Sequence, residues 1–146
     1  TILAAAERHG LGPRDVIVDA LALTIASDGN GAKTALSVID WCQERGLNSV
    51  MGVSNISFGL PNRGAVNGAM LVAAMARGMT CAILNPCDEA TRGSILAANA
   101  IVVGGDGAAE YAAAYTKEQR EEQGRFAALL PGLSLSRWRA TVVMCG

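Results

Sequence analysis

The sequence predicts an α/β fold in which parallel strands alternate with amphipathic helices, and three observations support this prediction. Of the 146 residues, 51% are hydrophobic and 17% are charged, which is enough apolar material for the core of one ordinary domain. Only 4% are aromatic, and a core of small aliphatic residues suits helices packed on parallel strands. Short apolar runs also alternate along the chain with stretches of helical periodicity.

The first predicted strand is followed directly by an acidic residue. Residues Ile2 to His9 have the pattern of a helix that ends at Gly10. The apolar run Val16 to Val18 then predicts a short buried strand, with Asp19 at its C-terminal end.

Two more strands and two helices follow in alternation. Apolar residues recur at helical spacing from Ala32 to Arg45, and Ser49 to Val53 predicts a second buried strand. The next helix is predicted from Ala65 to Arg77, and the third buried strand from Cys81 to Leu84. In (β/α) barrels and in open parallel sheets, ligands bind where the strands end, so the polar residues after these strands are binding-site candidates.

The last part of the chain contains two helical patterns. Glu89 to Val103 predicts a helix, although Ile101 to Val103 also fits a short strand. Ala108 to Gln123 predicts a long helix with alternating surface charges. Residues 124–146 have no clear period.

Charge, hydropathy and cysteine spacing argue against several classes of function. The net charge is -1 and no basic cluster is present, so no nucleic-acid partner is expected. The uncharged apolar stretches are shorter than the roughly 20 residues that cross a membrane, so no membrane segment is expected. The cysteines contain no C-x-x-C pair, which predicts buried thiols in a reducing, cytoplasmic compartment and no metal site. They are Cys42, Cys81, Cys87 and Cys145.

Two catalytic motifs are incomplete. Gly104 to Glu110 begins like a dinucleotide-binding loop, but Glu110 stands where G-x-G-x-x-G requires its third glycine. Gly52 to Ile56 resembles a nucleophile elbow only as far as Ser54, and the single histidine, His9, has no motif around it. Neither a nicotinamide-dependent enzyme nor a serine hydrolase is expected.

A polar loop after the second predicted strand is the main candidate for a binding site. It carries neutral hydrogen-bonding side chains and one arginine: Ser54, Asn55, Ser57, Asn62, Arg63 and Asn67. This set suits recognition of a polar heterocycle better than hydrolysis, but an ordinary surface loop has the same composition. The role of Asp19 is equally undecided at this point, because an acid at a strand end either caps the next segment or accepts paired N–H donors from a ligand.

Two segments of the chain resemble a known family. Residues 51–63 read MGVSNISFGLPNR and are followed by Asn67, and residues 78–86 read GMTCAILNP. Together they resemble the pterin-binding domain of cobalamin-dependent methyltransferases. These are the methyltetrahydrofolate:corrinoid protein methyltransferases and the folate module of cobalamin-dependent methionine synthase.

The resemblance implies a fold and a set of partners. The fold is the C-terminal portion of a (β/α)₈ TIM barrel of the dihydropteroate synthase type. Residues 1–123 would form the C-terminal part of this pterin-binding barrel domain, and residues 124–146 its edge or a linker. The N-terminal half of the barrel is then expected to precede Thr1. The implied partners are that missing half, a corrinoid protein or cobalamin-binding domain, and a second copy of the chain in a homodimer.

The resemblance also implies roles for individual residues. Asn55 matches the asparagine that hydrogen-bonds N5 of the pterin and is the implied catalytic residue, whereas Asp19 matches the aspartate that binds the pterin ring. The same string of residues adds three implied substrate-binding positions, Gly52, Ser54 and Arg63. Where the family usually has Asp-Pro this chain has alanine at position 20, a change expected to relax the loop and keep the acid.

The implied reaction is methyl transfer from 5-methyltetrahydrofolate to a corrinoid (cobalamin) cofactor carried by another domain or protein. A hydrogen bond at N5 would assist, because an amine is a poor leaving group and charge develops on it as the C–N bond breaks. One alternative is a pterin-binding enzyme similar to dihydropteroate synthase, which would need a basic pocket for diphosphate. Another is a non-catalytic half-barrel that needs a partner to cover its sheet edges.

Overall fold

The computed structural model describes residues 1–85 and 87–116. Residues Thr1–Tyr111 form one compact unit, and a second unit begins at Ala112. The predicted domain boundary after residue 123, the segment 124–146 and the end of the helix predicted to reach Gln123 lie outside the described residues.

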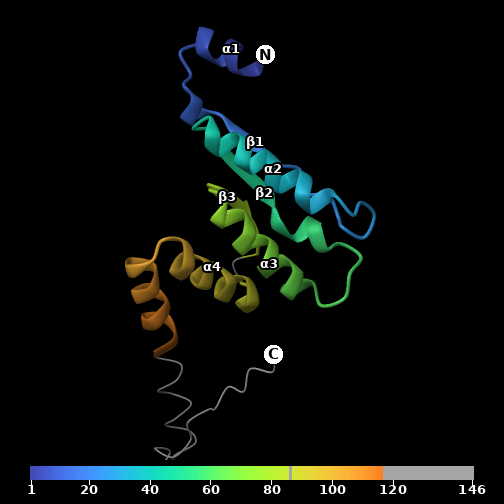
Figure 1. The fold of residues 1–146 in the computed structure, drawn as a ribbon, viewed down its shortest axis with the longest axis vertical. Coiled ribbons are helices and arrows are strands. Elements are labelled where there is room, and N and C mark those ends of the chain that lie inside the picture. The colour runs from blue at the N-terminus through green and yellow to red at the C-terminus, as the bar shows by residue number, and fades with distance from the viewer. Residues whose placement is uncertain (86, 117–146) are drawn as a thin grey trace, which may run out of the picture. The chain divides into compact units, whose positions relative to one another are not determined.

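Helices and strands alternate along the first unit in the predicted order (Figure 1). The labelled α-helices are α1 (Ile2–Arg8), α2 (Gly31–Glu44), α3 (Arg63–Ala76) and α4 (Glu89–Val102), and the strands are β1 (Ile17–Asp19), β2 (Asn48–Gly52) and β3 (Cys81–Ile83). Each labelled element is confirmed to within two residues at its ends, and residues 101–102 are helical, not a strand. Residues 105–116 are also helical, in agreement with the helix predicted from Ala108. No helix among residues 1–85 and 87–116 is long and apolar enough to cross a membrane.

The three strands form a parallel sheet in the order β1-β2-β3. Asp19 is paired with Val50, and Gly52 is paired with Ile83. The three strands therefore end at the same edge of the sheet. Parallel strands that alternate with helices confirm the α/β class. Residues that follow β1, β2 and β3 in the sequence consequently emerge close to one another.

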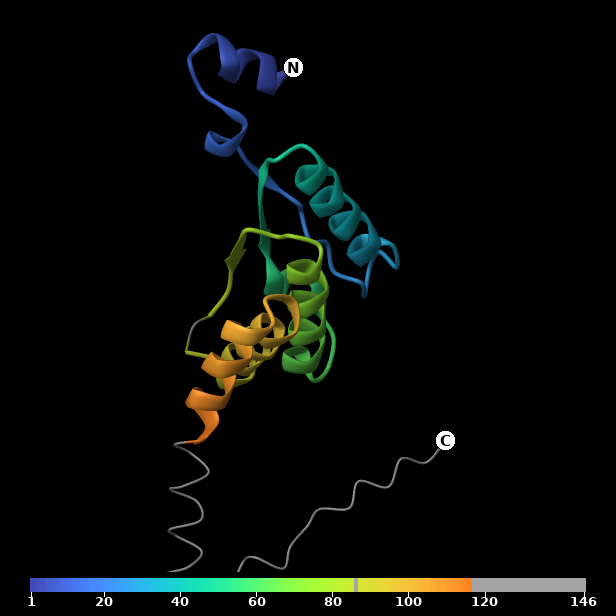
Figure 2. The ribbon, with the colours of Figure 1, turned by 60° about the vertical axis from the view of Figure 1, so that its left-hand side comes forward.

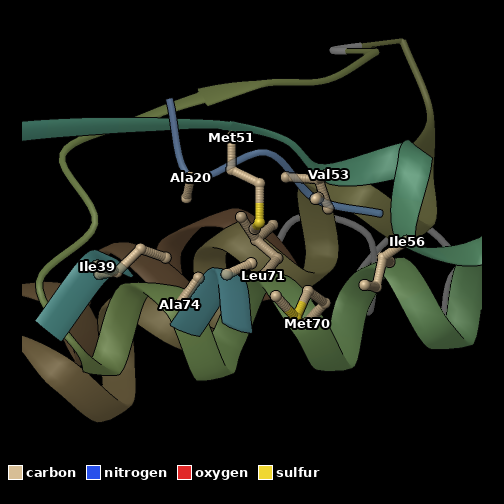
Figure 3. Close-up of a cluster of buried hydrophobic side chains, with 10 residues drawn as sticks. Ala20, Ile39, Met51, Val53, Ile56, Met70, Leu71 and Ala74 are labelled. Carbon is tan, nitrogen blue, oxygen red and sulfur yellow. The ribbon is translucent and has the colours of Figure 1, made fainter. Parts of the chain in front are cut away.

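The core lies between one face of this sheet and helices α2 and α3. Figure 3 shows Met51 projecting from β2 toward Leu71 of α3, and Ile39 of α2 and Ala74 belong to the same buried cluster. These four side chains are at most 1% exposed. Burying a large aliphatic side chain contributes roughly 1.5–3 kcal/mol, so this cluster fixes both helices on the sheet.

The opposite face of the sheet is not covered by the described residues, and this corrects the prediction that the strands are buried. Ile17 of β1 and Ile83 of β3 are 57% and 64% exposed. All three residues of β3 are exposed. The reason is that β1 and β3 are edge strands, and the helices contact the sheet mainly through β2 on one face.

The prediction that the cysteines are buried is right for one residue and wrong for two. Cys42 on α2 is buried, whereas Cys81 on β3 and Cys87 in the following loop are exposed. Cys145 lies outside the described residues. Burial raises the pKa of the Cys42 thiol, and the nearby charge of Arg45 partly opposes this shift.

Helices α3 and α4 pack side by side in both ribbon views (Figures 1 and 2). Gly68 of α3 lies opposite Ser94 of α4. A Cβ at position 68 would be 2.4 Å from Ser94 Oγ, which is closer than two such atoms can approach. The missing side chain at Gly68 therefore permits the close contact of the two helices.

Candidate functional site

The C-terminal end of β1 forms a tight turn around Asp19. Oδ1 of this exposed residue accepts a hydrogen bond from the N–H of Leu21 at 2.9 Å, and Leu21 has the left-handed φ of +48° that residues other than glycine rarely adopt. The N–H of Ala20 donates to Val50 O at 2.9 Å, a bond that proline could not make. The loop is therefore tied to β2, and the expectation that alanine relaxes it is wrong.

β2 runs directly into a 3₁₀ turn, Val53–Ser57, that presents Asn55 to solvent. The apolar residues of the turn are buried and anchor it, whereas Ser54 and Asn55 are exposed. A Cβ at Gly52 would lie 3.1 Å from Nδ2 of Asn55. Because Gly52 has no side chain, the Asn55 amide can lie against the strand end, at the sheet edge where β1 ends with Asp19.

The loop after β1 is bonded to the segment after β2. The Thr24 hydroxyl donates to Phe58 O at 2.5 Å. The N–H of Ile25 donates to Ile56 O at 3.1 Å. These two bonds hold the segments that carry Asp19 and Asn55 in a fixed relation.

The Arg63 side chain is held by oxygen atoms of the same turn. Its Nε donates to Ser57 Oγ at 3.0 Å, and its Nη2 donates to Ser54 O at 2.7 Å. The guanidinium also lies 5.9 Å from the centre of the Phe58 ring, within the range of a cation–π contact. Within residues 1–85 and 87–116, no carboxylate forms an ion pair with Arg63.

A cavity of about 460 Å³ opens beyond the ends of β2 and β3. It is lined by residues of the turn, of the first half of α3, of the end of β3 and of the start of α4: Val53, Ser54, Arg63, Gly64, Asn67, Ile83, Leu84, Asn85, Asp88 and Thr91. Asp88 caps α4 by accepting the Thr91 N–H at 3.0 Å and the Thr91 hydroxyl at 2.5 Å. The cavity thus has both polar and apolar walls, and the Asp88 carboxylate in it is already used to begin a helix.

The structure brings some of the predicted site residues together and leaves others apart. Arg63 is bonded to Ser54, and Gly52 lies under Asn55. Asp19 and Asn55 follow neighbouring strands, but neither lines the cavity.

Three polar residues that line the cavity were not predicted as site residues: Asn85, Asp88 and Thr91. For Asp88 a signal was available, because an acid directly before a helical pattern is a typical N-cap. Asn85 lies in the second family-like segment but has no pattern of its own that indicates binding. Thr91 reaches the cavity through the packing of α4, which no local pattern reveals.

The site offers hydrogen-bonding groups and one cation. The Asn55 amide can donate and accept, and the Asp19 carboxylate has acceptor capacity beyond its bond to Leu21. In the described part of the chain, no group of three or more His, Cys, Asp or Glu side chains could hold a metal ion. A planar ligand with ring N–H groups fits this set of donors and acceptors.

Comparisons with known proteins agree with this chemistry. Residues 1–85 match the model of a family described as pterin binding enzyme. The chain is also similar to the methylcorrinoid:tetrahydrofolate methyltransferase of Eubacterium limosum, with 27% identity over 99 residues, covering 66% of this chain and 36% of the relative. The chain therefore spans about a third of that relative's length. Taken together, the two matches confirm the resemblance to pterin-binding domains of corrinoid methyltransferases.

Proposed function

This chain belongs to the pterin binding enzyme family, and we propose that it is part of a larger methyltransferase that moves a methyl group from 5-methyltetrahydrofolate to a corrinoid. The observation that carries the proposal is the exposed Asn55 amide, which lies against Gly52 at the sheet edge where β1 ends with Asp19. The similar Eubacterium limosum protein, which is named for a methylcorrinoid and tetrahydrofolate, supports this substrate pair.

Asn55 is the residue we assign to N5 of the folate. When the bond between the methyl carbon and N5 breaks, its electron pair stays on N5, and the Asn55 amide N–H can donate to that growing charge. A contact that strengthens in the transition state lowers the barrier. The anchored turn keeps the amide in place, and Gly52 and Ser54 next to it are assigned to substrate binding.

Asp19 is assigned a positioning role. Its Oδ1 already accepts the Leu21 N–H, which fixes the carboxylate at the strand end. The remaining lone pairs can accept the ring N–H and the exocyclic amine of a pterin together, and such a paired contact sets the orientation of the ring. Correct orientation brings N5 to Asn55.

A corrinoid carried by another domain or protein supplies the cobalt that takes up the methyl group. The name of the relative, methylcorrinoid:tetrahydrofolate methyltransferase, attaches the methyl group to the corrinoid and not to the folate. The contacts assigned here serve transfer in either direction, because forward and reverse reactions pass through the same transition state.

We propose that the sheet belongs to a (β/α)₈ barrel in the complete protein. Its strands are parallel, and the uncovered face carries Ile17 and Ile83. In such barrels the inner face of the strands is packed with branched apolar side chains. The implied partner is the rest of the barrel, and a second copy of the chain is the alternative way to cover this face.

Substitution of Asn55 tests the function in the complete protein that contains this chain. Asn55→Ala should lower kcat for methyl transfer by about a hundredfold or more, because one preorganised donor to the transition state is lost. The KM for 5-methyltetrahydrofolate should change less. Asp19→Asn should instead mainly raise that KM. Both values come from the change in corrinoid absorbance at varied folate concentration.

The exposed Asn30 provides the matched control, because its side chain makes no capping bond to α2. Asn30→Ala should leave both constants unchanged. If Asn55→Ala transfers the methyl group at the original rate, the assigned role is wrong. Condensation of a pterin with p-aminobenzoate, without methyl transfer, would instead support an enzyme similar to dihydropteroate synthase. Activity in neither assay would support a non-catalytic half-barrel.

A further inference from the structure

The cavity beyond β2 and β3 contains a positive charge that is oriented but not neutralised. Two nitrogens of Arg63 donate to Ser57 Oγ and Ser54 O, and these neutral acceptors fix the guanidinium without cancelling its charge. The carboxylate that lines the same cavity, Asp88, is engaged by the N–H and hydroxyl of Thr91. A fixed guanidinium is well suited to binding a carboxylate.

A second polar group in this cavity has an unsatisfied atom. Asn67 lines the cavity, and its Oδ1 is buried without a hydrogen-bond partner among the described residues. An unsatisfied buried polar atom destabilises the free protein, and a ligand that bonds to it removes that cost. Because no bond to Oδ1 fixes this amide, rotation about its last side-chain bond can present either its oxygen or its NH₂ group to a ligand.

We propose that the cavity around Arg63 and Asn67 binds the carboxylate-bearing tail of the folate, the aminobenzoylglutamate group attached to the pterin ring. This inference rests on the proposed function, which puts the ring at Asn55. Val53 and Ser54 line the cavity and precede Asn55 directly, so a tail that leaves the ring can enter it across Ser54. Arg63 then pairs with a carboxylate, and Asn67 pairs with the amide of the tail.

Gly64 allows a charge to be added to this cavity with little disturbance. It lines the cavity, and a Cβ there would lie 3.7 Å from the Ala90 Cβ, an ordinary contact. Gly64→Asp introduces a negative charge, and Gly64→Asn introduces a neutral side chain of nearly the same size. The position is in the first turn of α3, where an acidic residue is favourable for the helix.

The experiment compares two ligands by titration calorimetry on the complete protein that contains this chain. The ligands are 5-methyltetrahydrofolate and 5,6-dimethyltetrahydropterin, which lacks the tail. The wild-type protein should bind the folate about tenfold or more tightly than the pterin, as expected for a charged hydrogen-bonded pair. Gly64→Asp should reduce this ratio of Kd values about tenfold relative to Gly64→Asn. Arg63→Gln should also reduce the ratio, whereas Arg77→Gln at the other end of α3 should not.

The outcomes separate this inference from the proposed function. Equal Kd values for the two ligands in the wild-type protein would overturn the tail site and leave pterin binding intact. A ratio of Kd values that is the same in Gly64→Asp and Gly64→Asn would also overturn it. The tail site would likewise be overturned if inorganic phosphate competed for the cavity while the presence of the tail made no difference to Kd. Binding of neither ligand would overturn the proposed function itself.

Discussion

One backbone angle stores strain at the edge of the site. Leu21 has a φ of +48°, a conformation that costs an ordinary residue roughly 1–2 kcal/mol. Its side chain is 70% exposed, so removing it loses little apolar burial. Leu21→Gly should therefore raise the free energy of unfolding by about 1 kcal/mol, because glycine adopts this angle without a steric penalty. Urea unfolding of the full chain measures the change.

Asn62 is the matched position for this prediction. Its φ is +47°, but asparagine tolerates the left-handed region better than leucine does. Asn62→Gly should change the free energy of unfolding by less than Leu21→Gly. An equal gain at the two positions would mean that leucine at this angle is no more strained than asparagine.

The contact between two helices depends on one missing side chain. A Cβ at Gly68 of α3 would lie 2.4 Å from Ser94 Oγ but 3.4 Å from Ser94 Cβ. Gly68→Ala should therefore destabilise the protein by about 1–3 kcal/mol through overpacking. Ser94→Ala removes the clashing oxygen, so the double variant should recover most of this loss. A double-mutant cycle in urea measures the coupling between the two positions.

Gly64, on the same helix, controls for the helical preference of alanine. A Cβ there meets only Ala90 at 3.7 Å, so Gly64→Ala should stabilise the protein by about 0.5–1 kcal/mol. If Gly68→Ala were equally stabilising, α3 and α4 would not be held as closely as the structure has them. Additive effects of Gly68→Ala and Ser94→Ala would lead to the same conclusion.

The order and ends of these elements could be predicted because local residues determine them. Gly46 and Gly78 adopt left-handed angles just after α2 and α3, as their place at the end of an apolar periodicity predicts. The exposure of β3 could not be predicted, since an apolar run of this length is the same whether or not another layer covers it. The positions of Asp19 and Asn55 at the ends of neighbouring strands were predictable from the sequence. The cavity residue Thr91 was not, because it depends on the packing of α4 against α3.

The three cysteines of the unit Thr1–Tyr111 differ in exposure, so their alkylation rates show how often the core of the unit opens. Cys42 is buried in the native structure, whereas Cys81 and Cys87 are exposed. Iodoacetamide should modify the two exposed thiols rapidly, because their reaction needs no opening of the core. Cys42 should react only as often as the core around α2 opens. Peptide mapping by mass spectrometry over time measures the three rates, and equal rates would mean that α2 is not held on the sheet.

The same buried thiol should make the stability of the unit depend on alkaline pH. Burial raises the pKa of Cys42, although the charge of Arg45 opposes the shift, so the folded state retains the thiol proton to a higher pH than the unfolded state. The stabilising contribution is complete below the ordinary thiol pKa and is lost as the pH rises through the raised value. The free energy of unfolding should therefore fall more steeply with alkaline pH in the wild-type chain than in Cys42→Ala. The comparison uses slopes, because removing the sulfur also leaves a small cavity that lowers stability at every pH. Equal slopes would assign the alkaline loss to other ionising groups and leave Cys42 as a simple packing residue.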